Sequence, residues 1–392
     1  MSNSKNQDKT VLERIEKSIH TLEDDKFSLY FFVMDTKGQP NSQLSYIYQL
    51  AKTLYDKKYN VTMLYQLENP YSKEELDSLL KNNENVDYNR VFVGVSDWMG
   101  KDYADIPHLN ISTDKWVVSP SDFLFIPEVF SSLMFETYKQ NIPCKRYVLL
   151  QNYDNVTDFI PLGVQWLNYG ISDVITTTEF QKNLIQEVFP YTKVDVLPPY
   201  IENIFCKPEK PQKLIVNILC KDQKIINKII KNFYWKYPSY QFVSFRDLRG
   251  FSREKFAELL KEGAITIWID ENTYFGYSAL EAMRCNNVVI GKIPENETEW
   301  MVEGDSLKNN VIWFDNYKQL PFILSAVIKA WMTDKLSQEL IQNMEETNAK
   351  YLKSDWDINV ENLITDIKNK RLVEFNGFHK AIENKLAKKE EQ

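Results

Sequence analysis

The stretch that most constrains the fold of this 392-residue chain is residues 264–301. It opens with an apolar, β-branched run at 265–269, which predicts a buried strand followed by a polar loop. A short helix is expected next, with Ser278 as its N-cap and Glu281 closing a capping box. A second strand at 288–290 completes a strand–loop–helix–strand unit. In open α/β sheets, ligands bind where loops leave the carboxyl ends of such strands.

Strands alternate with helices through the rest of the chain as well. At 392 residues the chain is too long for one ordinary core, and it suits two domains. The alternation predicts an α/β fold with a doubly wound parallel sheet in each domain. Strands are expected at residues 27–34, 61–65, 90–95, 122–126, 147–150, 173–177 and 194–197 in the first half, and at 213–219, 240–245, 265–269, 288–290 and 311–314 in the second.

The order of motifs in residues 275–291 resembles the donor-site signature of group 1 glycosyltransferases. Phe275-Gly276 is followed by Leu-Glu-Ala-Met at 280–283 and by Val-Val-Ile-Gly at 288–291. Those enzymes are retaining, glycogen synthase-like glycosyltransferases of the GT-B fold. The resemblance implies two Rossmann-like domains that face each other across a cleft, and transfer of a sugar from a nucleotide-sugar donor.

The resemblance also implies roles for residues around the predicted helix. Glu281 matches the second glutamate of the family's E-x7-E motif, which accepts hydrogen bonds from the ribose hydroxyls. Thr273 stands where the first glutamate of that motif falls, so Glu271, two residues upstream, is the carboxylate expected near the donor sugar. Gly276 and Ser278 are expected to line the nucleotide side. A purely structural role for Glu281, as a helix cap, is the alternative.

Basic side chains follow the strands of the second domain. The family carries an arginine and a lysine that contact the donor diphosphate after the first of these strands. Here Lys221 and Lys224 follow the strand at 213–219, and Arg246 and Arg249, which follow the strand at 240–245, are expected to assist them. Opposite charge stabilises a diphosphate as it leaves with its negative charge. The alternative is a solvated loop with ordinary lysines.

Two residues of the first domain are predicted to face the cleft. Gly38 lies in the loop after the first strand, which borders the cleft in the resembled family, although a simple turn glycine is the alternative. Asn152 stands where the family often has a histidine near the donor sugar. Its amide is able to bond sugar hydroxyls, with capping of the loop end as the alternative.

The predicted domain organisation has five parts. Residues 1–26 form an amphipathic extension, and 27–206 form the N-terminal, acceptor-side domain. Residues 207–354 form the C-terminal donor domain after a proline-containing linker. Residues 355–371 are expected as a helix that crosses back to the first domain, and 372–392 as a charged, frayed helical tail.

Composition excludes several classes of function. A net charge of -8 and a pI near 5.3 argue against a nucleic-acid partner, which needs clustered Lys and Arg. The four cysteines and three histidines lack metal-ligand spacing, so neither a metal nor a cofactor is expected. No apolar run approaches the roughly 20 residues of a membrane span, and no signal-peptide core opens the chain. A cytoplasmic protein is expected.

The leading hypothesis is therefore a hexosyltransferase-type enzyme that acts on an unidentified glycan, lipid or protein acceptor. The alternative is a protein of the same fold that has lost catalysis and serves as a binding or structural subunit. The departures at Thr273 and Asn152 motivate that alternative, and the terminal segments offer surfaces for a second copy or a protein partner. A generic Rossmann dehydrogenase is disfavoured because no Gly-x-Gly-x-x-Gly occurs.

Overall fold

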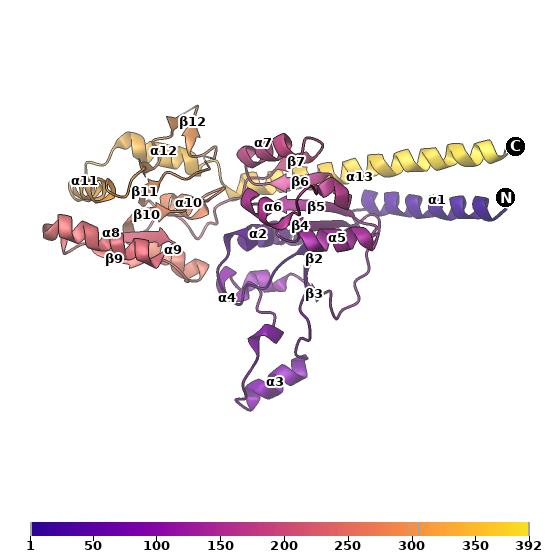
Figure 1. Ribbon diagram of the computed structural model, residues 1–392, viewed down its shortest axis with the longest axis horizontal. Coiled ribbons are helices and arrows are strands. Elements are labelled where there is room, and N and C mark those ends of the chain that lie inside the picture. Colours follow the sequence, from indigo (N-terminus) through magenta and orange to yellow (C-terminus); the bar gives the residue numbers. More distant parts are fainter. Residues whose placement is uncertain (1, 297, 305, 391–392) are drawn as a thin grey trace.

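The computed structural model describes residues 2–296, 298–304 and 306–390. Two α/β bodies lie side by side along the long axis of the molecule, and two helices project together from one end (Figure 1). Every strand pair within the two large sheets is parallel. The predicted α/β fold, with a doubly wound parallel sheet formed twice, is confirmed.

The first sheet, here called the N-terminal sheet, has seven strands in the order β3-β2-β1-β4-β5-β6-β7. The order reverses between β1 and β4, which creates the switch point at which such sheets bind ligands. Its strands are β1 (Ser28–Phe32), β2 (Asn60–Tyr65), β3 (His108–Asn110), β4 (Phe123–Pro127), β5 (Lys145–Leu150), β6 (Asp173–Thr176) and β7 (Lys193–Val196). The helices between them are α2 (Ser42–Asp56), α3 (Lys73–Lys81), α4 (Ser96–Met99), α5 (Ser131–Lys139), α6 (Tyr153–Phe159) and α7 (Glu179–Val188).

The second sheet, the C-terminal sheet, has five strands in the order β14-β11-β10-β8-β9, with its switch point between β8 and β10. Its strands are β8 (Lys213–Cys220), β9 (Ser244–Asp247), β10 (Gly263–Ile269), β11 (Val288–Lys292) and β14 (Ile312–Phe314). Its helices are α8 (Gln223–Lys236), α9 (Arg253–Glu262), α10 (Tyr277–Arg284), α11 (Leu320–Met332) and α12 (Gln338–Asn348). A small antiparallel pair, β12 (Val302–Glu303) and β13 (Ser306–Leu307), lies beside it.

Strand β10 shows why the central stretch folds as it does. All seven of its residues are buried, because helices cover both faces of the parallel sheet. Trp268 packs near Trp300 and Trp313, with ring centroids 6.0 and 6.2 Å away. Burial of each large apolar side chain contributes about 1.5–3 kcal/mol, so this strand anchors the loop that follows it.

The terminal helices α1 (Ser2–Glu23) and α13 (Lys353–Glu390) run antiparallel. Helix α13 begins on the N-terminal body, where Trp356 Nε1 donates to Thr53 Oγ1 at 2.8 Å. It continues unbroken along α1, and Glu16 contacts His379 Nε2 at 3.1 Å. The segments predicted separately at 355–371 and 372–392 are thus one helix as far as residue 390. Residues 1, 391 and 392 of the predicted terminal segments lie outside the described residues.

One predicted strand, at residues 90–95, is wrong. A short 3₁₀ helix, η1 (Tyr88–Arg90), and turns occupy this region. The N–H groups of Val93 and Gly94 donate to the Asp35 carboxylate at 3.3 Å instead of to a strand ladder, and Gly94 takes a positive φ of 65°. Helix α3, earlier in the same excursion, buries no residue and projects from the body (Figure 1). The local β-propensity of Val91 to Val93 is overridden by these contacts.

Candidate functional site

A small cavity lies at the carboxyl edge of the C-terminal sheet. It has a volume of about 160 Å³, and the loops after β8, β9 and β10 supply Lys221, Arg249 and Asp270 to its wall. Lys221 Nζ lies 3.1 Å from Asp270 Oδ1. Arg249 is held by Asp247 at 3.0 Å through Nε, and its Nη1 donates to the Lys221 carbonyl at 3.1 Å. Two cations therefore stand at the end of the sheet where ligands bind in this architecture.

Gly276 lies two residues before Ser278, which lines this cavity. It takes a left-handed φ of 80°, and a Cβ at this position would lie 2.9 Å from Trp300 Cζ2. Helix α10 begins directly after it, with no side-chain cap on its first N–H groups. The predicted N-cap at Ser278 is wrong, because Gly276 is the cap residue and Ser278 lies in the first turn, where it lines the cavity. Free N–H groups at a helix start attract anions.

Glu281 sits one turn further along α10 and is only 2% exposed. Its Oε1 lies 2.7 Å from Arg253 Nη1, while Arg253 Nε donates to Glu202 at 2.8 Å. Burial raises the pKa of Glu281, and Arg253 offsets that rise in part. Glu202 comes from the segment that joins the two sheets, and it also accepts from Tyr103 at 3.2 Å. Sequence reasoning missed Arg253 and Glu202, because neither belongs to a motif of fixed spacing.

The remaining predicted cations are not gathered at the cavity. Lys224 is exposed in the first turn of α8, and its backbone N–H donates to Asp222 at 2.7 Å. Arg246 bonds Glu262 at 2.7 Å and the Leu259 carbonyl at 3.3 Å, at the far end of α9. The structure therefore directs Arg246 away from the cavity. Arg249, the other arginine expected after this strand, does line the cavity.

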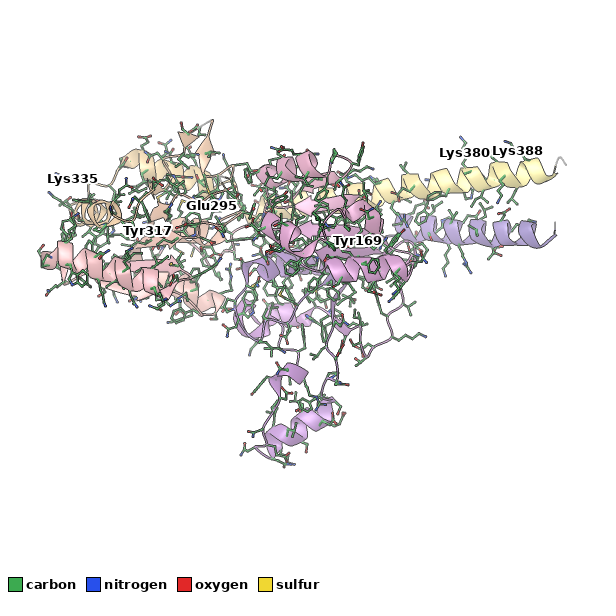
Figure 2. All side chains as sticks on the ribbon, in the orientation of Figure 1. Tyr169, Glu295, Tyr317, Lys335, Lys380 and Lys388 are labelled. Atoms are coloured by element: carbon green, nitrogen blue, oxygen red, sulfur yellow. The ribbon has the colours of Figure 1, made fainter. Side chains whose placement is uncertain are left out.

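The two residues predicted near the donor sugar lie in loops that meet across the bodies. Tyr317 donates to Glu271 Oε1 at 3.0 Å, and the Glu271 carbonyl accepts from the Glu295 N–H at 2.8 Å. Figure 2 shows Tyr317 and Glu295 in the C-terminal body. Asn152 caps α6 by accepting from the Asp154 N–H at 2.8 Å.

A hydrogen bond joins these two loops. Tyr274 donates to Asp154 Oδ1 at 2.8 Å, and these residues lie two or three positions from Glu271 and Asn152. Thr273, between Glu271 and Tyr274, is buried. The structure thus brings the loop of Asn152 toward the loop of Glu271. Asn152 itself caps helix α6, which is the alternative role considered for it above.

Glu128, at the carboxyl end of β4, was missed by the sequence reasoning. It is 1% exposed, and its Oε1 accepts from the Asn155 side chain at 2.9 Å and the Asn152 N–H at 3.1 Å. Burial raises the pKa of Glu128 to about 7, although these donors lower it in part. Gly38 lies on the neighbouring loop after β1 with a left-handed φ of 74°, and its N–H donates to Thr36 Oγ1 at 3.2 Å. Gly38 therefore has the turn conformation expected if its role is structural.

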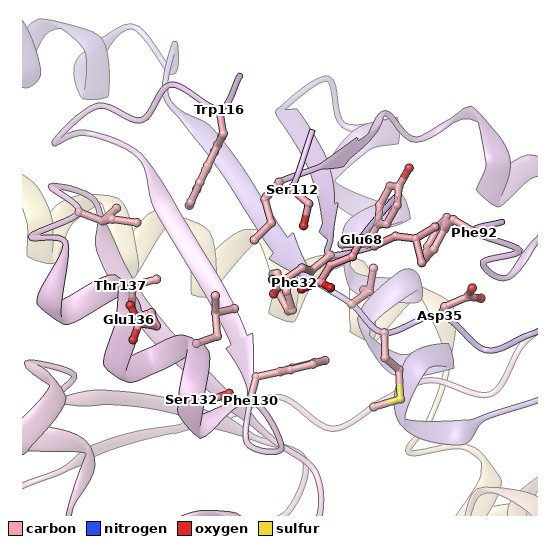
Figure 3. Close-up of a pocket in the computed structure, with 18 of the residues that line it drawn as sticks. Phe32, Asp35, Glu68, Phe92, Ser112, Trp116, Phe130, Ser132, Glu136 and Thr137 are labelled. Carbon is pink, nitrogen blue, oxygen red and sulfur yellow. The ribbon is translucent and has the colours of Figure 1, made fainter. Parts of the chain in front are cut away.

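A second and larger cavity lies at the carboxyl edge of the N-terminal sheet (Figure 3). Its volume is about 840 Å³, and its wall comes from the ends of β1, β2 and β3 together with α5 and the loop after β4. Five aromatic side chains share the wall with three carboxylates. They are Phe32, Tyr65, Phe92, Trp116 and Phe130, with Asp35, Glu68 and Glu136.

Comparison with known proteins supports the fold over nearly the whole chain. Sucrose-phosphate synthase from Thermosynechococcus elongatus superposes with a TM-score of 0.57 at 11% identity, covering 87% of this chain and 99% of that one. A pneumococcal O-GlcNAc transferase in complex with UDP and GlcNAc superposes with a TM-score of 0.54 at 9% identity, covering 91% and 99%. No protein-family model matches the chain.

A sequence relative points in the same direction. An alpha-1,6-glucosyltransferase of Actinobacillus pleuropneumoniae serotype 7 (strain AP76) is 26% identical over 201 residues. The alignment covers 48% of this chain and 61% of that enzyme, so the chain spans less than two thirds of its relative. The predicted resemblance to group 1 glycosyltransferases is confirmed. The chain has the GT-B fold, and it resembles glycosyltransferases in structure over most of its length and in sequence over about half of it.

Proposed function

We propose that this chain is a glycosyltransferase that moves a sugar from a nucleotide-sugar donor to an acceptor with retention of configuration. The observation that carries the proposal is the cavity at the carboxyl edge of the C-terminal sheet. There Lys221, Arg249 and the uncapped start of α10 converge on one small space. This combination fits a diphosphate, because cations and free N–H groups stabilise the negative charge of the leaving nucleotide.

The roles of the site residues follow from their places. Lys221, Arg249 and Ser278 line the diphosphate position, and Gly276 lets the backbone approach it closely. Glu281, oriented by Arg253, is the carboxylate proposed to accept from the ribose hydroxyls. Lys224 adds charge at the rim of the site without touching the ligand.

In the proposed reaction, the bond between the anomeric carbon and the diphosphate oxygen breaks while an acceptor oxygen bonds to the same face of that carbon. The acceptor hydroxyl proton passes to the departing phosphate oxygen. Glu271 and Asn152, on the two loops joined by Tyr274 and Asp154, are proposed to hold the donor sugar. Gly38 borders the acceptor side. The two cations supply the charge compensation, so the proposal includes no metal ion.

The relatives guide the choice of probe. The pneumococcal structure contains UDP, which makes UDP the first nucleotide to test. The sequence relative is named as a glucosyltransferase, which makes UDP-glucose the first donor. A non-catalytic subunit is the less favoured alternative, because the relatives reported above carry the names of enzymes.

The test measures binding and turnover on the same preparation. Calorimetry with UDP and with uridine is expected to show tighter binding of UDP. A panel of sugar nucleotides is then screened for transfer or slow hydrolysis, and NMR of the product reads the anomeric configuration. Glu271→Ala is expected to reduce turnover while UDP affinity persists, with Glu295→Ala as the matched control from the adjoining loop. Absence of UDP binding, or UDP binding without turnover across the panel, overturns the proposed enzyme.

A further inference from the structure

We propose that the acceptor is an uncharged glycan chain and that it binds in the aromatic cavity at the carboxyl edge of the N-terminal sheet. This inference rests on the proposed function and names its acceptor class.

The position of the cavity is that of a ligand site. Its wall includes Val33 to Asp35 after β1, Tyr65 to Glu68 at the end of β2, and Phe130, Ser132 and Leu133 after β4. Strands β1 and β4 flank the switch point of the sheet, where ligands bind in open α/β folds. A volume of about 840 Å³ lies toward the upper end of the range for ligand pockets and suits several sugar units better than one.

The cavity is open because the excursion after β2 does not cover it. Helix α3 lies between β2 and β3 in sequence, yet it buries no residue and projects away from the sheet (Figure 1). Of the aromatic side chains that line the cavity, Phe32 is buried, whereas Tyr65, Phe92, Trp116 and Phe130 keep part of their surface exposed. A chain of sugars needs such an open groove, because it must enter with its non-reacting units still attached.

Aromatic rings form the wall in pairs. Tyr65 stacks on Phe92 with ring centroids 3.8 Å apart, and Phe32 meets Phe130 edge to face at 4.7 Å. Trp116 packs against Tyr30, which does not itself line the cavity. Figure 3 shows Trp116, Phe92 and Phe130 on different sides of the cavity. This packing holds the rings in place, and the rings that stay partly exposed offer electron-rich surface against which the C–H faces of sugars pack.

The charge of the wall selects among glycans. It carries Asp35, Glu68 and Glu136, and none of its described lining residues is lysine, arginine or histidine. Outside the lining, Lys37 pairs with Asp35 at 2.7 Å, and Lys139 lies 3.9 Å from Glu136. Carboxylates accept hydrogen bonds from sugar hydroxyls, whereas phosphate, sulfate or uronate groups in this cavity meet like charge. Neutral chains are therefore favoured over anionic ones.

The experiment compares neutral and anionic oligosaccharides by saturation-transfer NMR and calorimetry, with UDP present. The neutral probes are isomaltohexaose, maltohexaose and chitohexaose, and the anionic probe is a sulfated isomaltohexaose. At least one neutral probe is expected to bind in the millimolar range or tighter, at least tenfold better than the sulfated one. Failure of all three neutral probes, or equal binding of the sulfated one, overturns the inference.

Two variants locate the binding. Trp116→Ala is expected to weaken the neutral probe at least fivefold, while Trp235→Ala, an exposed tryptophan on α8, leaves it unchanged. The double variant Glu68→Lys, Glu136→Lys changes only exposed side chains, so it is expected to fold normally. Its affinity for the sulfated probe is expected to rise. Unchanged binding in both variants places the glycan elsewhere and overturns the assignment.

These experiments distinguish failure of the acceptor inference from failure of the proposed function. UDP binding without any oligosaccharide binding leaves the donor site standing and removes only the acceptor inference. Oligosaccharide binding that depends on Trp116, without UDP binding, establishes the glycan cavity and removes the proposed transferase.

Discussion

The carboxyl edges of the two sheets share a topology and differ in chemistry. At the C-terminal sheet the loops after β8 and β9 place Lys221 and Arg249 beside an uncapped helix in a cavity of about 160 Å³. At the N-terminal sheet the corresponding edge holds a cavity of about 840 Å³, whose wall is aromatic and acidic. The shared topology creates an edge cavity in each sheet, and the loops give the two cavities different chemistry; under the functions proposed above, one suits a charged nucleotide and the other a neutral glycan chain.

The largest effect is expected where the C-terminal body contacts the segment that joins the two sheets. Arg253 lies 2.5–2.8 Å from the carboxylates of Glu281 and Glu202, and all three side chains are largely buried. Arg253→Met is expected to destabilise the protein by about 3–5 kcal/mol, because two buried carboxylates lose their counter-charge. Chemical denaturation measures this loss. Lys255→Met on the same helix, an exposed residue, is the control, and equal losses would refute the buried triad.

The N-terminal edge is expected to respond to pH through Glu128. Burial raises its pKa in the folded state to about 7 from an ordinary value of 4.5, so the folded state binds an extra proton between these values. The contribution of Glu128 to the free energy of unfolding is therefore fully present below pH 4.5 and is lost as the pH rises to about 7. At about 1.4 kcal/mol per pH unit, the loss is about 3 kcal/mol.

Glu128→Gln sharpens this test. The neutral amide keeps an acceptor for Asn155 and removes the titration, so the fall in unfolding free energy between pH 4.5 and 7 is expected to flatten. Glu136→Gln, an exposed residue in the same body, is expected to leave the pH profile of stability unchanged. Parallel profiles for the parent protein and Glu128→Gln would show that Glu128 does not hold the proton.

Much of this organisation was predictable from sequence, for reasons that differ by element. Strand β10 is a mostly apolar, β-branched run, so its burial and its βαβ context were predictable from the local sequence. The loop at residues 90–95 was not, since its hydrogen bonds go to Asp35, more than fifty positions away in the chain. The start of α10 was misplaced because the capping-box pattern at Ser278 and Glu281 was weighted above Gly276, whose left-handed φ of 80° and close approach to Trp300 are visible only in the folded chain.

The candidate site divides in the same way. Lys221 and Ser278 follow or begin regular elements, so the edge rule placed them in the cavity. Arg246 was assigned wrongly, because a side chain's direction at a strand end is set by its partner, here Glu262. Glu128 and Arg253 gave no signal, since burial of a charge is a tertiary property.

Gly276 tests how tightly the C-terminal edge is built. Gly276→Ala is expected to cost about 1–3 kcal/mol, because the residue has a left-handed φ and its Cβ meets Trp300 at 2.9 Å. UDP affinity is expected to fall as well, since the start of α10 must shift. Gly250→Ala is a matched control with a φ of 77° and no atom within 4 Å of its Cβ. Equal costs in the two variants would mean that the close approach at Gly276 is unimportant.

The smallest effect expected is at the charged rim of the same edge. Lys221 is largely exposed and paired with Asp270, so its contribution to binding is screened and partly offset. Lys221→Ala with Lys224→Ala is expected to weaken UDP roughly fivefold, about 1 kcal/mol, and to leave uridine unaffected. The difference should shrink as salt rises, since screening removes the attraction for the diphosphate first. Lys228→Ala, exposed on the same helix, is expected to change neither ligand. If it weakens UDP as much as the double variant does, the edge attracts anions through its general charge, and Lys221 has no specific place in the site.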